Sequence, residues 1–305
     1  MEIFHSIEDF AKTGYECHVA LGFFDGVHRG HRAVIDDCVM HKGVCRSAVL
    51  TFSESPARVM GRSDIRLLTD NDRKARLIAE RGIDALIFAD FRSIRELSAE
   101  EFITRVLRDQ LRARRVVCGY NYRFGKDGGG DTRMLAEICT ALGIEVSVKE
   151  PVDLGGQAVS STAIREKLVA GDIEGANVML GYRYSVGGRI GTGNHIGTKM
   201  GFPTVNLPIG EGLVVPRYGV YASRVTVDGV TYRGATNIGV HPTVGENEQP
   251  LCETFLLDFG GEELYGERAV CELSRFIRPE RKFSSVDELT AQVSSDIETI
   301  KGIRQ

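Results

Sequence analysis

The sequence predicts two domains of different fold class, an α/β domain with a parallel sheet followed by a mainly β barrel with a terminal helix. Up to about residue 180, apolar strand-like segments alternate with amphipathic helical segments, which is the pattern of βαβ units. Beyond Gly181, short strand-like segments follow one another until a last helical stripe begins at Val286. We therefore expect domains at 1–180 and 181–305, a division that the length of 305 residues supports.

The composition indicates a globular protein that acts on small molecules. Hydrophobic residues make up 42% of the chain, and the net charge is −4 without a basic block, which argues against nucleic-acid binding. The seven cysteines include no CxxC pair, so we expect buried thiols in a reducing cytoplasm and no zinc site. Because no signal peptide or segment of transmembrane length is evident, we expect no membrane association.

The most informative segment is the turn that joins the first clear strand to the first clear helix. Residues 17–21 have the pattern of a short strand, and from about His31 the chain shows helical periodicity. The turn between them, residues 22–31, contains Asp25 together with two histidines, His28 and His31. In an open parallel sheet, ligands bind outside the carboxyl ends of the strands, where a helix N-terminus offers unpaired N–H groups to a phosphate. The turn is therefore our candidate nucleotide site.

The spacing of the two histidines suggests how such a site works. His28 and His31 are three residues apart, so one helical turn brings both rings to the same side. Imidazoles that carry a proton near neutral pH can neutralise charge that develops on a phosphoryl group during attack at phosphorus. The alternatives are a metal-binding pair, or a capped helix in which the histidines are incidental.

The rest of the first half continues the alternation of strands and helices. Further strands are expected at 46–52, 84–89, 116–118 and 144–148. Helices are expected at 70–81, 132–142 and 172–180. A further helix is expected to begin after a capping box at Ser98–Glu101.

Two more segments lie where a parallel sheet would present ligand-binding residues. The first, residues 119–125, follows a strand and includes Asn121, and the glycines of 128–130 after it predict a flexible loop. The second, residues 159–165, places Ser161 and Thr162 at a helix start with Arg165 one turn later. An arginine beside a triphosphate would stabilise pyrophosphate as it leaves.

Taken together, these segments resemble the FAD synthetase (FMN adenylyltransferase) half of the bacterial bifunctional riboflavin kinase/FAD synthetase family. The matching strings are GxFDGVHxGH, G-x-(Asn/Asp)-aromatic-x-Phe-Gly and SSTxIR, and the resemblance covers residues 15–170. It implies a Rossmann-like nucleotidyltransferase domain. It also implies that ATP is held by Gly22, Phe23, Asp25, Gly26, His28 and His31, that Asn121 lies by the transferred phosphate, and that Ser161, Thr162 and Arg165 hold the triphosphate. The family often has Thr-Phe-Glu-Pro-His-Pro after the second strand, where this chain has Ser53, Glu54, Ser55 and Pro56, so that histidine is missing here.

The second half has the pattern of a small antiparallel barrel. Strands are expected at 184–186, 220–227, 230–235, 253–259 and 269–276, with a hairpin turn at Asp228–Gly229. A terminal helix carries an apolar stripe that should pack on the barrel, formed by Val286, Leu289, Val293, Ile297 and Ile300.

A glycine-rich segment near the start of this half resembles a phosphate-binding loop without matching Walker A. In residues 187–201 the order is Gly197-Thr198-Lys199, whereas Walker A ends in Gly-Lys-Ser/Thr before a helix. Its glycines can still let backbone amides approach a phosphate. Thr204 and Asn206 are two residues apart in an extended segment, so both would offer an oxygen to a hard cation on one side.

This half resembles the riboflavin kinase fold, with GxxxGxxxGxPTxN and an Asn-Ile-Gly segment before Glu253, over about residues 183–300. The resemblance implies that Thr204 and Asn206 bind Mg²⁺, that Glu253 is the base for the riboflavin hydroxyl, and that Arg278 and Arg281 lie in the loop over the flavin. Phosphate contacts would come from Gly193 and Gly197. Thr198 replaces a common arginine, so one further phosphate contact is either weaker or supplied by Lys199.

The two resemblances together predict a bifunctional enzyme that makes FMN from riboflavin and then FAD from FMN. ATP is the expected co-substrate of both reactions, and Mg²⁺ is the expected cofactor. Two alternatives stay open: transfer of a nucleotide to another phosphate acceptor, or one degenerate half that only binds flavin. The expected partners are riboflavin, FMN and ATP, with neither nucleic acid nor membrane. The sequence leaves self-association open, and each half should fold alone.

Overall fold

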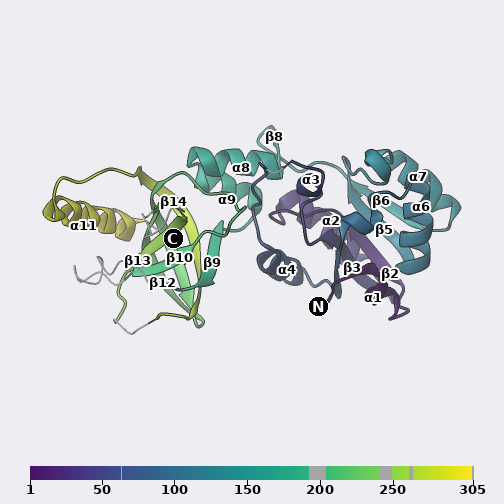
Figure 1. Ribbon diagram of the computed structural model, residues 1–305, viewed down its shortest axis with the longest axis horizontal. Helices are drawn as coiled ribbons and strands as arrows, with labels where there is room; N and C mark the ends of the chain where they lie inside the picture. Colours follow the sequence, from purple (N-terminus) through teal and green to yellow (C-terminus); the bar gives the residue numbers. More distant parts are fainter. Residues whose placement is uncertain (63, 192–203, 241–248, 261–263, 304–305) are drawn as a thin grey trace. The chain divides into compact units, whose positions relative to one another are not determined.

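The structure, a computed structural model, describes residues 1–62, 64–191, 204–240, 249–260 and 264–303. The chain divides into two compact units, Met1–Ser161 and Thr162–Gln305, and each is considered by itself (Figure 1).

The first unit is built on a six-stranded, fully parallel sheet, as the alternation of strands and helices predicts. Its strand order is β1 (Glu2–Phe4), β4 (Ala85–Ala89), β3 (Arg46–Phe52), β2 (Cys17–Leu21), β5 (Ala113–Gly119) and β6 (Glu145–Lys149). The three-residue edge strand β1 was not predicted, because so short a segment carries no periodicity. The turn after β2 thus leaves the middle of the sheet at its carboxyl end.

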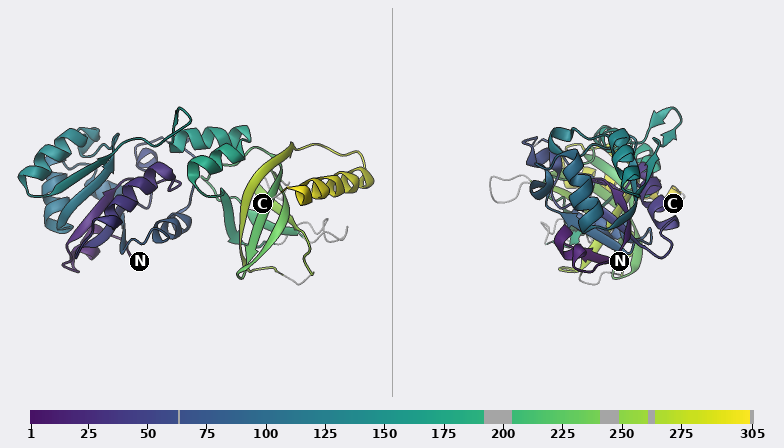
Figure 2. Two further views of the ribbon diagram at one scale, coloured as in Figure 1. Left: turned by 180° about the vertical axis from the view of Figure 1, so that it is seen from behind. Right: turned by 90° about the vertical axis from the view of Figure 1, so that its right-hand side faces the viewer.

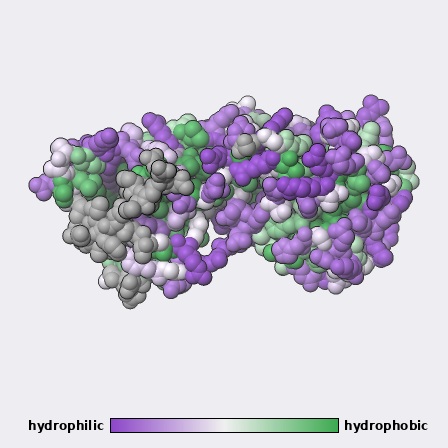
Figure 3. Space-filling model, viewed as in Figure 1, coloured by the Kyte–Doolittle hydropathy of each residue, from purple (hydrophilic) through white to green (hydrophobic). Residues whose placement is uncertain are grey.

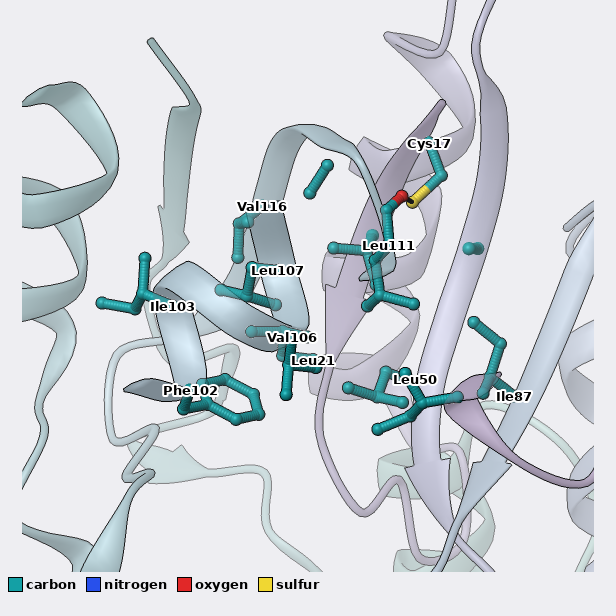
Figure 4. Packing of buried hydrophobic residues seen from close by; sticks show 14 of the residues in the cluster. Cys17, Leu21, Leu50, Ile87, Phe102, Ile103, Val106, Leu107, Leu111 and Val116 are labelled. Atoms are coloured by element: carbon teal, nitrogen blue, oxygen red, sulfur yellow. Dashed lines mark hydrogen bonds between the residues drawn. The ribbon is translucent and has the colours of Figure 1, made fainter. Parts of the chain in front are cut away.

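Helices cover both faces of this sheet (Figures 1 and 2). One face carries α1 (Ile7–Ala11), the π-helix η1 (Phe102–Gln110) and α7 (Thr132–Ala141); the other carries α2 (Arg29–Met40) and α4 (Asn71–Ala79). A capping box formed by Ser98 and Glu101 opens α6 (Ala99–Glu101), which leads into η1. Figure 4 shows the apolar side of η1, including Leu107, packed against Leu21 and Leu50 of the sheet.

Shorter elements complete the first unit. They are α3 (Pro56–Val59), α5 (Phe91–Ile94), the 3-10 turn η2 (Lys126–Gly128) and the hairpin β7 (Asp153–Leu154) with β8 (Gln157–Ala158). Residues 126–130, for which the sequence predicts a flexible loop, begin with η2, and Phe124 and Gly130 close this segment by exchanging backbone hydrogen bonds of 3.2 and 2.9 Å. A Cβ at Gly130 would lie 2.7 Å from the Phe124 ring, so glycine is needed for this closure.

The second unit is a near-closed antiparallel barrel, as predicted. Its strand order is β10 (Thr204–Pro208), β13 (Pro250–Leu256), β12 (Val230–Val240), β11 (Gly219–Val227), β14 (Arg268–Pro279) and β9 (Ser185–Arg189). A bridge in which Gly191 N donates to Asn206 O at 2.9 Å joins the two outer ends of this order. The predicted turn at Asp228–Gly229 joins β11 and β12, and both residues have the positive φ that a tight hairpin requires, 46° and 80°.

Three helices belong wholly or mainly to the second unit: α8 (Ser161–Ala170), α9 (Ile173–Leu180) and α11 (Val286–Gly302). The Asn177 side chain of α9 donates to Leu273 O of β14 at 2.9 Å and accepts from Tyr184 N at 2.7 Å, so α9 is fastened to the barrel. Ile297 and Ile300 of α11 are buried against the barrel, but Val286 is 64% exposed, so the predicted apolar stripe is wrong at its first turn.

The surface of the face drawn in Figure 3 is mostly hydrophilic, with hydrophobic residues in small patches. Within the described ranges, no helix is both long and apolar enough to cross a bilayer.

Candidate functional site

The turn between β2 and α2 has a strained backbone. Phe24 and Val27 have φ values of 54° and 37°, and Gly26 has a φ of 80°. A Cβ at Gly26 would also lie 2.6 Å from Leu68 Cδ1, so no other residue fits this position. Non-glycine residues with positive φ cost free energy and are concentrated at functional sites, which agrees with the importance that the sequence gives to this turn.

Asp25 holds this turn in place. Its buried carboxylate Oδ1 accepts from the backbone N–H groups of Leu68 at 2.9 Å and Thr69 at 3.3 Å, just before α4. Its carbonyl accepts from Ser161 Oγ at 2.9 Å, which ties the start of α8 to the turn. The structure therefore gives Asp25 a positioning role that the sequence did not predict, and the contact with ATP stays a prediction.

His28 and His31 come together as predicted. Their rings are stacked with centroids 3.5 Å apart and planes 16° apart, and the Phe24 ring meets His31 edge-on. His28 is the N-cap of α2, because its Nδ1 accepts from His31 N at 3.3 Å. That bond places the proton of a neutral His28 on Nε2. The helix cap, which the sequence offered as an alternative to a functional pair, is thus one part of the same arrangement.

His31 differs in charge from the expectation. Burial lowers its pKa well below the ordinary value, and His28 and the ammonium of Lys74 lower it further. Its Nδ1 is buried and has no hydrogen-bond partner within the described part of the chain. His31 is therefore a neutral imidazole near pH 7. It can form a hydrogen bond with a ligand but cannot supply positive charge.

Phe23 and Lys74 form a second contact in this turn. Thr51 Oγ1 donates to Phe23 O at 2.9 Å, and Lys74 Nζ lies 4.0 Å from the centroid of the half-buried Phe23 ring. Sequence reasoning missed Lys74. The available signal was its spacing from Leu77 and Ile78, which puts a lysine on the buried face of α4.

The other residues predicted for the first site lie on neighbouring elements. Gly22 follows β2, and the exposed Asn121 follows β5, which pairs with β2 in parallel, so the two turns leave the sheet at the same edge. Ser161 is joined to Asp25, whereas Thr162 and Arg165 lie further along α8, in the second unit.

The second candidate site is on the outer face of the barrel. Asn206 of β10 pairs in register with Glu253 of β13, and Thr204 Oγ1 donates to Glu253 Oε1 at 3.1 Å. Asn206 is 3% exposed, and its Oδ1 is buried without a hydrogen-bond partner among the described residues. Two oxygens on one strand beside a carboxylate form an arrangement that fits a hard cation and a hydroxyl substrate.

Asn237 extends this row of polar side chains. It lies opposite Glu253 on the next strand, β12, and its Nδ2 donates to Glu280 Oε1 at 3.2 Å. The sequence presents Asn237 only within its Asn-Ile-Gly segment. Its place beside Glu253 follows from strand pairing over 16 residues, which no local pattern reveals.

Arg278 and Arg281 are both paired with carboxylates of α11. Arg278 binds the buried Asp296 at 2.7 Å, and Arg281 binds Glu288 at 2.7 Å while lying 4.7 Å from the centroid of the Phe283 ring. These pairs fix the segment that leads into α11. The predicted contact with flavin stays a prediction. Gly193, Gly197, Thr198 and Lys199 lie outside the described residues.

Comparison with known proteins also divides the chain into two parts. The model of the FAD synthetase family matches residues 11–163, and that of the riboflavin kinase family matches residues 180–303.

Two relatives carry the name bifunctional riboflavin kinase/FMN adenylyltransferase and span nearly the whole chain. One, from Listeria monocytogenes, is 37% identical over 284 residues, 91% of this chain and 89% of its own. Another, from Escherichia coli K12, is 34% identical over 303 residues, 97% and 96% of the two chains. A crystal structure from Streptococcus pneumoniae, described as a macrolide-efflux protein, covers 99% of both chains with a TM-score of 0.88 and 27% identity.

Proposed function

Because this chain belongs to the bifunctional riboflavin kinase/FMN adenylyltransferase family, we infer that it converts riboflavin to FMN and FMN to FAD. The kinase reaction transfers the γ-phosphoryl group of ATP to the riboflavin 5′-hydroxyl. The adenylyltransferase reaction transfers AMP from a second ATP to the FMN phosphate and releases pyrophosphate. The expected small-molecule partners are therefore riboflavin, FMN and ATP.

We propose that the adenylyltransferase site is the turn after β2. The observation that carries this assignment is the stacked pair His28 and His31 at the carboxyl end of the central strand. With Nδ1 of His28 engaged in the helix cap, a neutral His28 carries its proton on Nε2, and this N–H would donate to an oxygen of the α-phosphate when ATP is bound. Gly22, Phe23, Asp25 and Gly26 shape the pocket for ATP, Asn121 contacts the transferred phosphate, and Ser161 holds the pyrophosphate part. The roles of Thr162 and Arg165 stay predictions, because both residues belong to the second unit.

We propose that Glu253 is the base of the kinase site. The supporting observation is the 3.1 Å bond from Thr204, which fixes the carboxylate on the strand beside Asn206, whose Oδ1 has no hydrogen-bond partner in the described part of the chain. A carboxylate held in this way can accept the proton of the riboflavin hydroxyl as it attacks the γ-phosphate.

Thr204 Oγ1 and Asn206 Oδ1 fit Mg²⁺, since both are neutral oxygens and the second lacks any other partner among the described residues. When bound, the ion would neutralise charge on the ATP phosphates. In this proposal Gly193, Gly197 and Lys199 contact the phosphates, and Arg278 and Arg281 support the segment over the flavin. Residues 1–180 contain the adenylyltransferase and 181–305 the kinase. The seven free cysteines, six of them buried, suit a cytoplasmic enzyme.

One assay tests this function directly. Purified protein is incubated with riboflavin, ATP and Mg²⁺, and riboflavin, FMN and FAD are separated over time. FMN should appear first and FAD should follow. Added FMN without riboflavin should still give FAD. Absence of either product would contradict the assignment of the corresponding half.

A further inference from the structure

Lys74 is buried in a way that folding alone does not explain. The residue is 1% exposed, on the same face of α4 as Leu77 and Ile78. Lysine is almost never buried to this extent without a carboxylate partner. Within the described ranges of the chain, Lys74 forms no ion pair with aspartate or glutamate.

The surroundings of the ammonium satisfy it only in part. Of its three N–H donors, one makes a long hydrogen bond of 3.4 Å to Phe52 O, and the group faces the Phe23 ring at 4.0 Å. The nearest acid is Asp25, whose Oδ1 is already engaged by the backbone N–H groups of Leu68 and Thr69. Burying an apolar side chain of similar length would cost less free energy at this position. Stability therefore does not explain why a charged side chain is buried here, which suggests that the charge has a function.

The contacts of Lys74 all belong to the candidate adenylyltransferase site. Phe23 and Asp25 are in the turn after β2, Phe52 ends the neighbouring strand β3, and the charge of Lys74 acts on His31. Because His31 is neutral, this turn needs another source of positive charge if it is to hold phosphates. Lys74 is a buried cation in this position, fixed by the helix that carries it.

We propose that Lys74 is a positioning residue of the adenylyltransferase site, where its ammonium fixes the Phe23 ring from one side and adds positive charge beside the histidine pair. This inference rests on the function proposed above for the first unit. Lys74 acts on the nucleotide through Phe23 and His31, and touches neither substrate.

The protonation of Lys74 gives the proposal a measurable signature. Burial lowers its pKa from the ordinary 10.5 to about 8, although the charge of Asp25 acts in the opposite direction. The charged or titratable groups that face it are Asp25 and His31, which is neutral over this range. The ammonium is therefore present below about pH 8 in the free enzyme and lost above it, so kcat/KM for FMN should fall with rising pH.

The experiment compares full-length Lys74→Met and Lys74→Arg with the wild-type enzyme between pH 6 and 9.5. The rate of FAD formation from FMN is measured along with riboflavin phosphorylation, which takes place in the other unit and reports on intact protein. Lys42→Met is the matched control, because it removes the same charge from the same unit at a half-exposed pair with Asp84. His31 is titrated by NMR in each variant.

For Lys74→Met we expect kcat/KM for FMN to fall at least about tenfold, the alkaline decline to disappear and the pKa of His31 to rise. Lys74→Arg should keep most of the activity but show no decline near pH 8, because a guanidinium does not lose its proton there. Lys42→Met should match the wild type in both reactions.

Three results would overturn the proposal: FAD formation by Lys74→Met within twofold of wild type, an unchanged alkaline decline in Lys74→Arg, or an unchanged His31 titration in Lys74→Met. If Lys74→Met does not fold, the alkaline decline of Lys74→Arg still tests the proposal by itself. A wild-type enzyme that makes no FAD at all would instead refute the function proposed for the first unit.

Discussion

Thr204 and Glu253 lie 49 positions apart in the chain, yet the threonine hydroxyl donates a 3.1 Å hydrogen bond to the glutamate carboxylate. Antiparallel pairing of β10 with β13 brings them together, and the same pairing puts Asn206 directly opposite Glu253. The threonine therefore orients the carboxylate through its proton while its oxygen lone pairs stay available to a cation.

Replacing Glu253 by glutamine should abolish riboflavin phosphorylation while FMN is still converted to FAD. The amide keeps the shape of the side chain but cannot accept the substrate proton, so kcat should fall about 10²-fold or more with little change in riboflavin binding. Product analysis with riboflavin and with FMN as separate substrates measures both reactions. Unchanged riboflavin turnover would move the base to another residue.

Thr204→Val should weaken phosphoryl transfer by removing a cation ligand and the hydrogen bond that orients Glu253. We expect a lower rate and a higher Mg²⁺ concentration for half-maximal activity. Thr226→Val is the matched control, because the Thr226 hydroxyl bonds Thr231 on the exposed side of the β11–β12 hairpin. Equal Mg²⁺ dependence in the two variants would argue against Thr204 as a ligand.

His28→Ala and His31→Ala should remove FAD formation by a factor of about 10² to 10³ and spare FMN production. His28→Ala also removes a helix cap, which typically costs about 1 kcal/mol. His28→Asn separates the two effects, since asparagine caps helices well but lacks the imidazole. It should regain the thermal stability without regaining FAD formation, and recovery of both would reduce His28 to a structural cap.

A fragment of residues 162–305 should be more stable than one of residues 181–305. The longer fragment keeps α9, whose Ile173, Met179 and Leu180 are buried and whose Asn177 bonds the barrel. Loss of three buried apolar side chains should cost at least about 3 kcal/mol. Urea unfolding compares the two, and each should be assayed for FMN production. Equal stability would show that α9 is dispensable for the barrel.

Asp37→Asn should destabilise the first unit and make its free energy of unfolding less dependent on pH in the acid range. Burial raises the pKa of Asp37, but hydrogen bonds from Lys149 and Arg115 lower it more, to below the ordinary 3.8. Because the pKa of the carboxylate is lower in the folded state, its stabilisation is fully present at pH values above the pKa of the unfolded state. It is lost as the pH falls through the pKa of the folded state. At neutral pH we expect a loss of about 3 kcal/mol, because the exposed Glu145 is then the one ion-pair partner that the buried Arg115 keeps among the described residues.

Urea titrations at pH 7 and pH 3 measure this effect, and the wild type should lose more stability between them than the variant. Asp9→Asn is the control, since it breaks a solvated pair with Lys12. A variant whose acid response equals that of the wild type would exclude Asp37 as the titrating group.

The sequence by itself determined most of the longer elements and their order. The alternation of apolar strand-like and helical segments predicted the parallel sheet. The pair Ser98 and Glu101 predicted the capping box, and Asp228–Gly229 predicted the hairpin turn. These features depend on turn chemistry and side-chain periodicity, which act over a few neighbouring residues. For the same reason the stacking of His28 and His31, three residues apart, was foreseeable.

Only the tertiary structure decided which distant side chains meet. The bond of Thr204 to Glu253, the pairing of Arg278 with Asp296 and the packing of α9 on β14 depend on strand register and helix docking. The charge of His31 and the burial of Lys74 also depend on how closely the surrounding elements exclude water, because desolvation is a property of the assembled fold and not of the local sequence.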